Sequence, residues 1–352
     1  MICRTLLSGT TYGMLDFGDT RTWYRKDAYD KSYVTWGWHP EGRWGWFNCE
    51  AAGTHTGALL QYLRTGKWTY FQFGEDLTRH IMDVDTVHYN TVARDPRLAS
   101  VMDDEYSRVG SMHRHNADHW GGRNEEASHT NVVGILLYYY LTGDPRAHDV
   151  ALEVGDFFLG EHITYSGHPD IAPQRTLANV LWGDVWLYEL THDERYLRGA
   201  AKWAARLIAG QQQDGSWVET YDPLSNAWTG EVSSSYMAYY TLPALIAYHR
   251  LTNESAVAAA IVNGTRYLMA HEEFYPFFDA LAYGWELTGE AQFLDEGQAR
   301  LARLIEKQDR SGDPDRQGII SEKITYGRVS PFLYSIPWLF DALEGAQDDD
   351  RR

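Results

Sequence analysis

The stretch Tyr140-Leu141-Thr142-Gly143-Asp144 decides the fold, because the same turn recurs along the chain. Each copy closes a run of apolar residues with helical spacing. Each also carries Gly, His or Asn where the end of a helix favours a left-handed backbone, and acidic or small residues that can open the next helix follow. Five copies of one turn predict five helical hairpins. The other four copies lie at 61–66, 189–193, 250–254 and 286–290.

The apolar runs on either side of the turns define the predicted helices. The first helices of the hairpins are expected at 48–64, 128–142, 174–190, 232–251 and 276–287, and the second helices at 67–81, 145–160, 194–211, 255–270 and 291–308. A sixth run, 330–345, contains Pro331 and Pro337 and has no obvious partner after it. This pattern predicts an all-α protein, an (α/α)6 toroid that is either complete or incomplete at its last hairpin. An open α-solenoid is the alternative, but the turns are too unevenly spaced for a regular solenoid.

The division into segments follows from the same pattern. Residues 1–47 are interpreted as an aromatic-rich segment packed on the toroid, 48–346 as the toroid, and 347–352 as a disordered acidic tail. The long connections, at 1–47, 82–127, 161–173, 212–231 and 309–329, all lead into first helices, so they are expected on one face of the ring. Loops of this length usually carry function. The helix N-termini on that face favour an anionic ligand.

Composition narrows the partners. The 352 residues include 31 Lys and Arg against 49 Asp and Glu, a net charge of −18, which argues against nucleic-acid binding. No apolar run long enough for a membrane span or a signal peptide is visible, so the chain as it stands is expected to be cytoplasmic, or secreted if it belongs to a longer protein. Fourteen Trp and 24 Tyr favour a saccharide partner, because aromatic rings stack on sugar rings. The oligomeric state stays open.

The first long loop holds Trp residues separated by Gly and charged residues. We interpret them as the aromatic wall of a carbohydrate site, with a hydrophobic plug under the ring as the alternative. Asn48 and Glu50 either cap the first helix or line the site. The Trp residues assigned to substrate binding are Trp36, Trp38, Trp44 and Trp46, and Trp228 in a later loop joins them.

The second long loop concentrates His and Arg, with six of the 14 His residues between His80 and His129. One interpretation is a divalent-cation site for Ca or Zn, although no compact metal-ligand motif is present and no cofactor is firmly implied. The other is acid/base chemistry beside guanidinium groups. The residues assigned to substrate binding in this region are Asp85, His88, His113, Arg114, Trp120 and Asn124.

This combination suits β-elimination from a uronic acid, in which the carboxylate must be neutralised before the C5 proton can leave. Arg114 and Arg123 would neutralise the carboxylate. The base would be His115 or His119, and the proton donor would be Tyr236 or His129. Three alternatives stay open: a glycoside hydrolase using a carboxylate pair among Asp85, Glu125, Glu219 and Glu231, a non-catalytic carbohydrate-binding toroid, and a sugar epimerase or isomerase.

Several ordered motifs resemble a known family. They are residues 13–19, 44–50, 83–88, 113–119 and 128–144, and together they resemble the central (α/α)6 domain of exo-acting rhamnogalacturonan lyase-like proteins, polysaccharide lyase family 26 and its relatives. The resemblance covers about residues 10–290. It implies removal of terminal units from rhamnogalacturonan I by elimination. Such lyases have β-rich domains beside the toroid, and no strand-rich segment is visible at either end of this chain.

Overall fold

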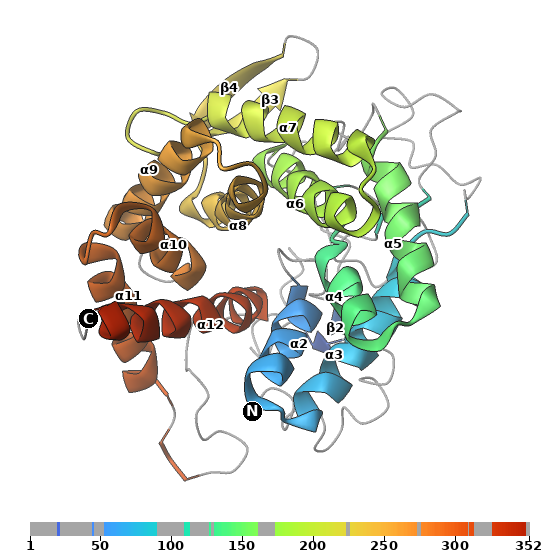
Figure 1. The fold of residues 1–352 in the computed structure, drawn as a ribbon, viewed down its shortest axis with the longest axis horizontal. Coiled ribbons are helices and arrows are strands. Elements are labelled where there is room, and N and C mark those ends of the chain that lie inside the picture. The colour runs from blue at the N-terminus through green and yellow to red at the C-terminus, as the bar shows by residue number, and fades with distance from the viewer. Residues whose placement is uncertain are drawn as a thin grey trace, which may run out of the picture.

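The computed structural model describes residues 20–21, 44–45, 53–89, 109–112, 127, 130–160, 173–222, 226–272, 276–308, 310–312 and 326–349. Within these ranges, helices make up two concentric layers (Figure 1). The inner layer consists of α2 (Gly53–Thr65), α4 (Val133–Thr142), α6 (Pro173–Thr191), α8 (Ser235–Thr252), α10 (Phe278–Thr288) and α12 (Tyr326–Asp349). The outer layer consists of α3 (Trp68–His80), α5 (Pro145–Phe158), α7 (Glu194–Ala209), α9 (Ser255–His271) and α11 (Gln292–Glu306).

The inner helices form a closed ring. Each packs against the next in chain order, and α12 packs against both α10 and α2, which brings the last helix beside the first (Figure 1). Each outer helix packs against the inner helix that precedes it. Within the described residues, no outer helix follows α12, which also contacts the outer helix α11. The predicted α/α toroid is therefore confirmed, and every predicted helix is present within a few residues of its expected bounds.

The layers follow from the distribution of apolar side chains. The outer helix α7 buries Tyr196, Ala200, Trp203, Ala204 and Leu207, which form a single stripe at helical spacing. The inner helices α4, α6, α8 and α10 are buried over most of their length, whereas α12 is largely half-buried or exposed. For example, every residue from Val133 to Tyr138 on α4 is buried. The main hydrophobic core thus lies between the two layers and runs around the ring.

The five recurrent turns share one geometry. The residue after each of the inner helices α2, α4, α6, α8 and α10 is left-handed, and its backbone N–H donates to the carbonyl four residues earlier at 2.7 Å. The Thr before it donates its hydroxyl to the carbonyl four residues before that Thr, as Thr142 does to Tyr138 at 2.8 Å. These bonds satisfy carbonyls that a helix end leaves unpaired. The left-handed residues are Gly66, Gly143, His192, Asn253 and Gly289.

At the closure of the ring, a side chain of α2 replaces a hydrogen-bond donor that is missing within α12. Pro337 lies inside this helix and has no N–H, so the carbonyl of Leu333 loses its helical donor. The side-chain amide of Gln61 on α2 donates to that carbonyl at 2.9 Å. Gly57 allows the close approach, because a Cβ at this position would lie 2.6 Å from the Leu333 Cβ. The proline thus creates the acceptor that ties the last helix to the first.

Four features differ from the sequence-based expectations. A β-hairpin of β3 (Val218–Asp222) and β4 (Ala227–Val232) occupies the long connection before α8. A two-residue ladder of β1 (Thr20–Arg21) and β2 (Trp44–Gly45) lies within the N-terminal segment. Helix α3 continues into a π-helical turn, η4 (Ile81–Asp85). The predicted disorder of the acidic tail is wrong for residues 347–349, because α12 extends to Asp349; residues 350–352 lie outside the described ranges.

Candidate functional site

Buried polar side chains gather around the first turns of the inner helices, at the end of the ring that receives the long connections. We call this the loop-side end, and the end with the five recurrent turns the turn-side end. Beyond the first turns the inner helices are mostly apolar, so a polar concentration at one end marks the candidate site. Its buried members include His55 and Thr56 on α2, Thr130 and Asn131 before α4, Gln174, Arg175, Thr176 and Asn179 on α6, Ser233 before α8, and Asp279 on α10.

Helices α6 and α8 bring an amide and a cation to this end. The Gln174 side-chain amide donates to the Thr241 hydroxyl at 2.9 Å. The Arg175 guanidinium carbon lies 5.4 Å from the centroid of the Tyr240 ring, and Arg175 is only 7% exposed. A guanidinium over an aromatic face keeps its positive charge and N–H donors, which suit a planar carboxylate. Arg175 therefore places a positive charge at the loop-side end of a protein whose net charge is negative.

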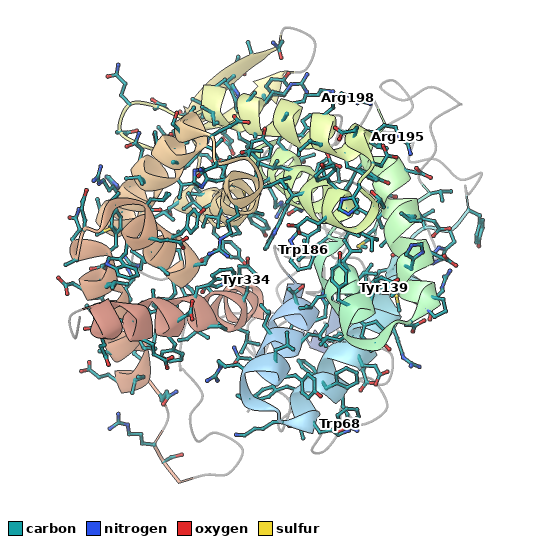
Figure 2. The ribbon with its side chains drawn as sticks, in the orientation of Figure 1. Trp68, Tyr139, Trp186, Arg195, Arg198 and Tyr334 are labelled. Atoms are coloured by element: carbon teal, nitrogen blue, oxygen red, sulfur yellow. The ribbon has the colours of Figure 1, made fainter. Side chains whose placement is uncertain are left out.

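Helices α10 and α12 bring a carboxyl and a hydroxyl together. Burial raises the pKa of Asp279 to about 7, although the backbone N–H groups of Asp279 and Ala280 oppose the shift. Burial and the neighbouring Asp279 raise the pKa of Tyr334. The Tyr334 ring meets Trp182 of α6 edge-on, with ring centroids 5.1 Å apart. Figure 2 shows Tyr334 on the side of α12 that faces the middle of the ring. Asp279 can therefore hold or release a proton near neutral pH.

Helices α2 and α4 enclose a neutral histidine. Burial lowers the pKa of His55 to about 3, with a smaller opposing effect from Asp85. Neither ring nitrogen has a hydrogen-bond partner within the described residues. A Cβ at Gly134 would lie 1.9 Å from the His55 ring, so only glycine fits there. The ring is uncharged at neutral pH and can both donate and accept one hydrogen bond.

The structure places Asp85 in the interior, and its predicted contact with substrate stays a prediction. Asp85 ends η4, is 1% exposed, and places its Oδ1 3.4 Å from the Nε2 of the buried His80. The sequence placed Asp85 in a loop, whereas the extension of α3 into η4 carries the carboxyl into the interior. Its described partners are structural.

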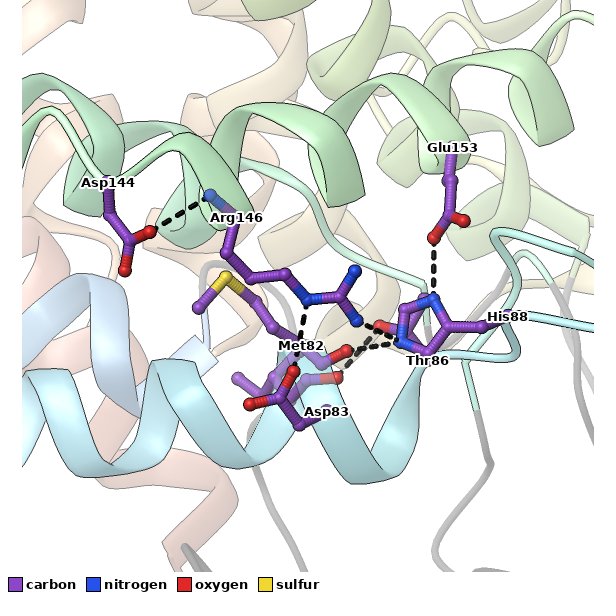
Figure 3. A network of polar contacts seen from close by, with 8 residues as sticks. Met82, Asp83, Thr86, His88, Asp144, Arg146 and Glu153 are labelled. Atoms are coloured by element: carbon purple, nitrogen blue, oxygen red, sulfur yellow. Dashed lines mark hydrogen bonds and ion pairs between the residues drawn. The ribbon is translucent and has the colours of Figure 1, made fainter.

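His88 is likewise placed in the outer layer rather than against the inner helices (Figure 3). Its Nδ1 lies 2.6 Å from Glu153 Oε2 on α5. Its Nε2 lies 3.0 Å from an Arg146 guanidinium nitrogen, and Arg146 also donates to Asp83 at 3.1 Å. Both ring nitrogens are thus occupied in joining η4 to α5. The predicted substrate contact of His88 stays a prediction.

Trp228 lies in β4 of the hairpin, and its predicted contact with substrate stays a prediction. Its indole N–H donates to the Arg206 carbonyl of α7 at 2.8 Å, and its ring lies against Gly210, where a Cβ would come within 2.5 Å. The ring also contacts Tyr221 of the hairpin, with centroids 5.4 Å apart. Trp228 therefore packs β4 against the end of the outer helix α7.

Most of the other predicted site residues lie outside the described residues, and their roles stay predictions. For Trp44 in β2 and Tyr236 in α8, the structure describes the backbone only. Tyr236 lies in the first turn of α8, as expected. The remaining predicted residues are Trp36, Trp38, Trp46, Asn48, Glu50, His113, Arg114, His115, His119, Trp120, Arg123, Asn124 and His129.

Sequence reasoning missed Gln174, Arg175, Asn179, Asp279 and Tyr334. For the residues of α6 and for Asp279, a usable signal was present: polar residues in the first turns of helices that are otherwise apolar. For Tyr334 no such signal exists, since its position opposite Trp182 depends on how α12 closes the ring.

The described part of the chain contains neither a cluster of metal ligands nor a membrane-spanning helix. There, no three His, Cys, Asp or Glu side chains are grouped so as to hold a metal ion. The divalent cation therefore stays a prediction tied to the second long loop. Among the described helices, none combines the length and the apolar character needed to cross a bilayer.

The described residues thus define an α/α toroid with a polar loop-side end. Comparison with known proteins agrees on the fold. The sequence profile of the PcRGLX-like protein C-terminal alpha/alpha toroid domain matches residues 8–157. Uncharacterized protein YetA of Bacillus subtilis (strain 168) is 32% identical over 146 residues, which are 41% of this chain and 14% of that protein. The match thus spans about a seventh of the length of this relative.

Solved structures show the same fold at low sequence identity. Cellobiose 2-epimerase from Spirochaeta thermophila DSM 6192 is similar with a TM-score of 0.59 and 13% identity, over 84% of this chain and 86% of that one. A family 76 glycoside hydrolase from a bovine Bacteroides thetaiotaomicron strain has a TM-score of 0.59 and 11% identity, over 88% and 71%. A polysaccharide lyase has a TM-score of 0.53 and 16% identity, over 90% and 97%. These similarities establish the toroid.

Proposed function

We propose that this protein is a carbohydrate-active enzyme, a polysaccharide lyase that cleaves a rhamnogalacturonan-like, uronate-containing polysaccharide from a chain end by β-elimination. The observation that carries the proposal is the profile match over residues 8–157, which includes the His- and Arg-rich segment 113–129 directly before α4. The ordered motifs that resemble exo-acting rhamnogalacturonan lyases lie largely in the same region. The toroid similarity to a polysaccharide lyase, a glycoside hydrolase and an epimerase is consistent with saccharide chemistry on this fold.

The proposed reaction assigns a role to each predicted group. His115 or His119 takes the proton from C5 of the uronate. The electron pair of that C–H bond forms the C4=C5 double bond as the C4–O4 bond breaks, and the departing O4 receives a proton from Tyr236 or His129.

The carboxylate next to C5 must be neutralised for this proton to become acidic enough to leave. Arg114 and Arg123 are the predicted partners, and Arg175 adds a guanidinium at the loop-side end. Inner-helix N-termini add positive potential. A divalent cation held by the second long loop could share this task; in that case, removing it with a chelator lowers the rate.

The proposal is tested by incubating the protein with rhamnogalacturonan and following the ultraviolet absorbance of the C4=C5 bond together with the number of new reducing ends. Elimination raises both in equal amounts. A rise in reducing ends without the absorbance indicates the glycoside-hydrolase alternative. Binding without either change indicates a non-catalytic toroid, and a changed sugar at constant chain length indicates an epimerase.

A further inference from the structure

We propose that Asp279 and Tyr334 form a subsite that binds hydroxyl groups of an uncharged sugar ring. The inference rests on the proposed function only in that a saccharide must enter the loop-side end. It assigns binding to residues of α10 and α12, outside the region 8–157 that matches the family profile.

Asp279 has unused hydrogen-bonding capacity. This side chain is 6% exposed, and its Oδ2 has no hydrogen-bond partner within the described residues. A buried acceptor without a partner destabilises the folded protein. Structures retain such groups for a reason, and a ligand that donates hydrogen bonds to Oδ2 removes this destabilisation when it binds.

The surroundings of Asp279 add a second polar group. Tyr334 on α12 supplies a hydroxyl that can donate and accept, and its ring is held by the buried Trp182 of α6, which is 2% exposed. Carboxyl and phenol groups together can bind the hydroxyl groups of a sugar.

The charges around Asp279 favour an uncharged ligand group. From α8, Arg250 acts on the carboxyl only weakly and pairs instead with Glu286 at 3.4 Å. From α11, Arg300 stacks on Phe277, 4.4 Å from the ring centroid, and pairs with Glu296. Within the described residues, no cation forms an ion pair with Asp279. A uronate carboxylate placed here would meet a group of like charge, whereas hydroxyl donors would not.

Binding at this subsite is linked to a proton. Sugar hydroxyls donate most strongly to an ionised carboxylate, and Asp279 has a pKa of about 7. Ligand binding then favours the ionised form and releases a proton. Below the pKa the affinity falls by up to about tenfold per pH unit.

The test uses isothermal titration calorimetry of a rhamnogalacturonan oligosaccharide and of its carboxyl-reduced, uncharged counterpart, between about pH 5 and pH 9. The wild type is compared with Asp279→Asn and Tyr334→Phe. The matched control is Asp184→Asn. Asp184 is also a fully buried carboxyl with a raised pKa, but its Oδ2 faces α7, where a Cβ at Gly199 would lie 2.4 Å away.

We expect Asp279→Asn to weaken binding of both ligands by about tenfold or more at about pH 8, and to reduce the pH dependence of affinity. Wild-type binding near neutral pH should release protons, measured as a dependence of the heat on the buffer. Tyr334→Phe should weaken binding but leave the number of protons released nearly the same. Asp184→Asn should change neither the affinity nor the proton release.

If Asp279→Asn and the wild type bind with equal affinity across this pH range, the inference is overturned. The proposed function survives that result as long as the wild type still shows lyase activity. Weaker binding limited to the uronate-containing ligand also overturns it, because the subsite would then recognise charge. If the wild type neither binds nor cleaves either oligosaccharide, the proposed function and the inference both fail.

Discussion

Replacing Asp279 by Asn should stabilise the protein at neutral pH, in a pH-dependent way. The pKa of Asp279 is about 7 in the folded state, whereas an aspartate in water has an ordinary value of 3.8, so the increase is about three units. Because the folded state binds the proton more tightly, wild-type stability is highest below the unfolded pKa and decreases as the pH rises towards 7. At about 1.4 kcal/mol per unit, the loss amounts to about 4 kcal/mol and then levels off.

Asn cannot ionise, so the variant lacks this loss. The difference in unfolding free energy between Asp279→Asn and the wild type should grow from near zero at about pH 4 to about 4 kcal/mol in favour of the variant at about pH 8. Urea denaturation of both proteins at several pH values measures it. Parallel curves for the two proteins across this range would refute the reasoning, because they would show that Asp279 ionises in the folded protein as it does in water.

Three further predictions test packing and backbone geometry. Gln61→Leu should lower the unfolding free energy by about 1–3 kcal/mol, because the Leu333 carbonyl loses its donor. Adding Pro337→Ala, which restores a helical N–H, should recover part of this loss. If Gln61→Leu lowers the unfolding free energy equally with Pro337 and with Ala at that position, the proline does not create the acceptor for Gln61. Asp184→Asn should stabilise the protein more at neutral than at acidic pH, since burial raises the pKa of this carboxyl; a pH-independent effect in denaturation would count against it. Gly289→Ala should cost about 1 kcal/mol in thermal denaturation, because φ is +69° with open space around it, and an unchanged melting temperature would argue against backbone strain.

The fold could be predicted from the sequence because its signals are local. The Thr and the left-handed residue of each recurrent turn, such as Thr142 and Gly143, act through hydrogen bonds within one helix end. Apolar periodicity then located each helix to within a few residues. The hairpin β3–β4 was not predicted, because it forms within a connection that we expected to be all loop.

The site was less predictable, because its geometry depends on contacts between distant segments. Asp85 and His88 have residue types suited to catalysis, but η4 directs one into the interior and the other towards α5. Asp279 and Tyr334 come together only once α12 has closed the ring. No spacing rule connects two residues so far apart in the chain and on different helices.

We expect catalysis to take place at the loop-side end, and the rate of unsaturated product formation from rhamnogalacturonan measures it. Three proteins are compared: the wild type, Arg175→Gln at the loop-side end, and Trp68→Ala, which alters a 56% exposed side chain at the turn-side end. Melting temperatures verify that each is folded. We expect Arg175→Gln to lower the rate by about tenfold or more and Trp68→Ala to leave it unchanged. A folded Arg175→Gln with the wild-type rate, or no unsaturated product from the wild type, would contradict this expectation.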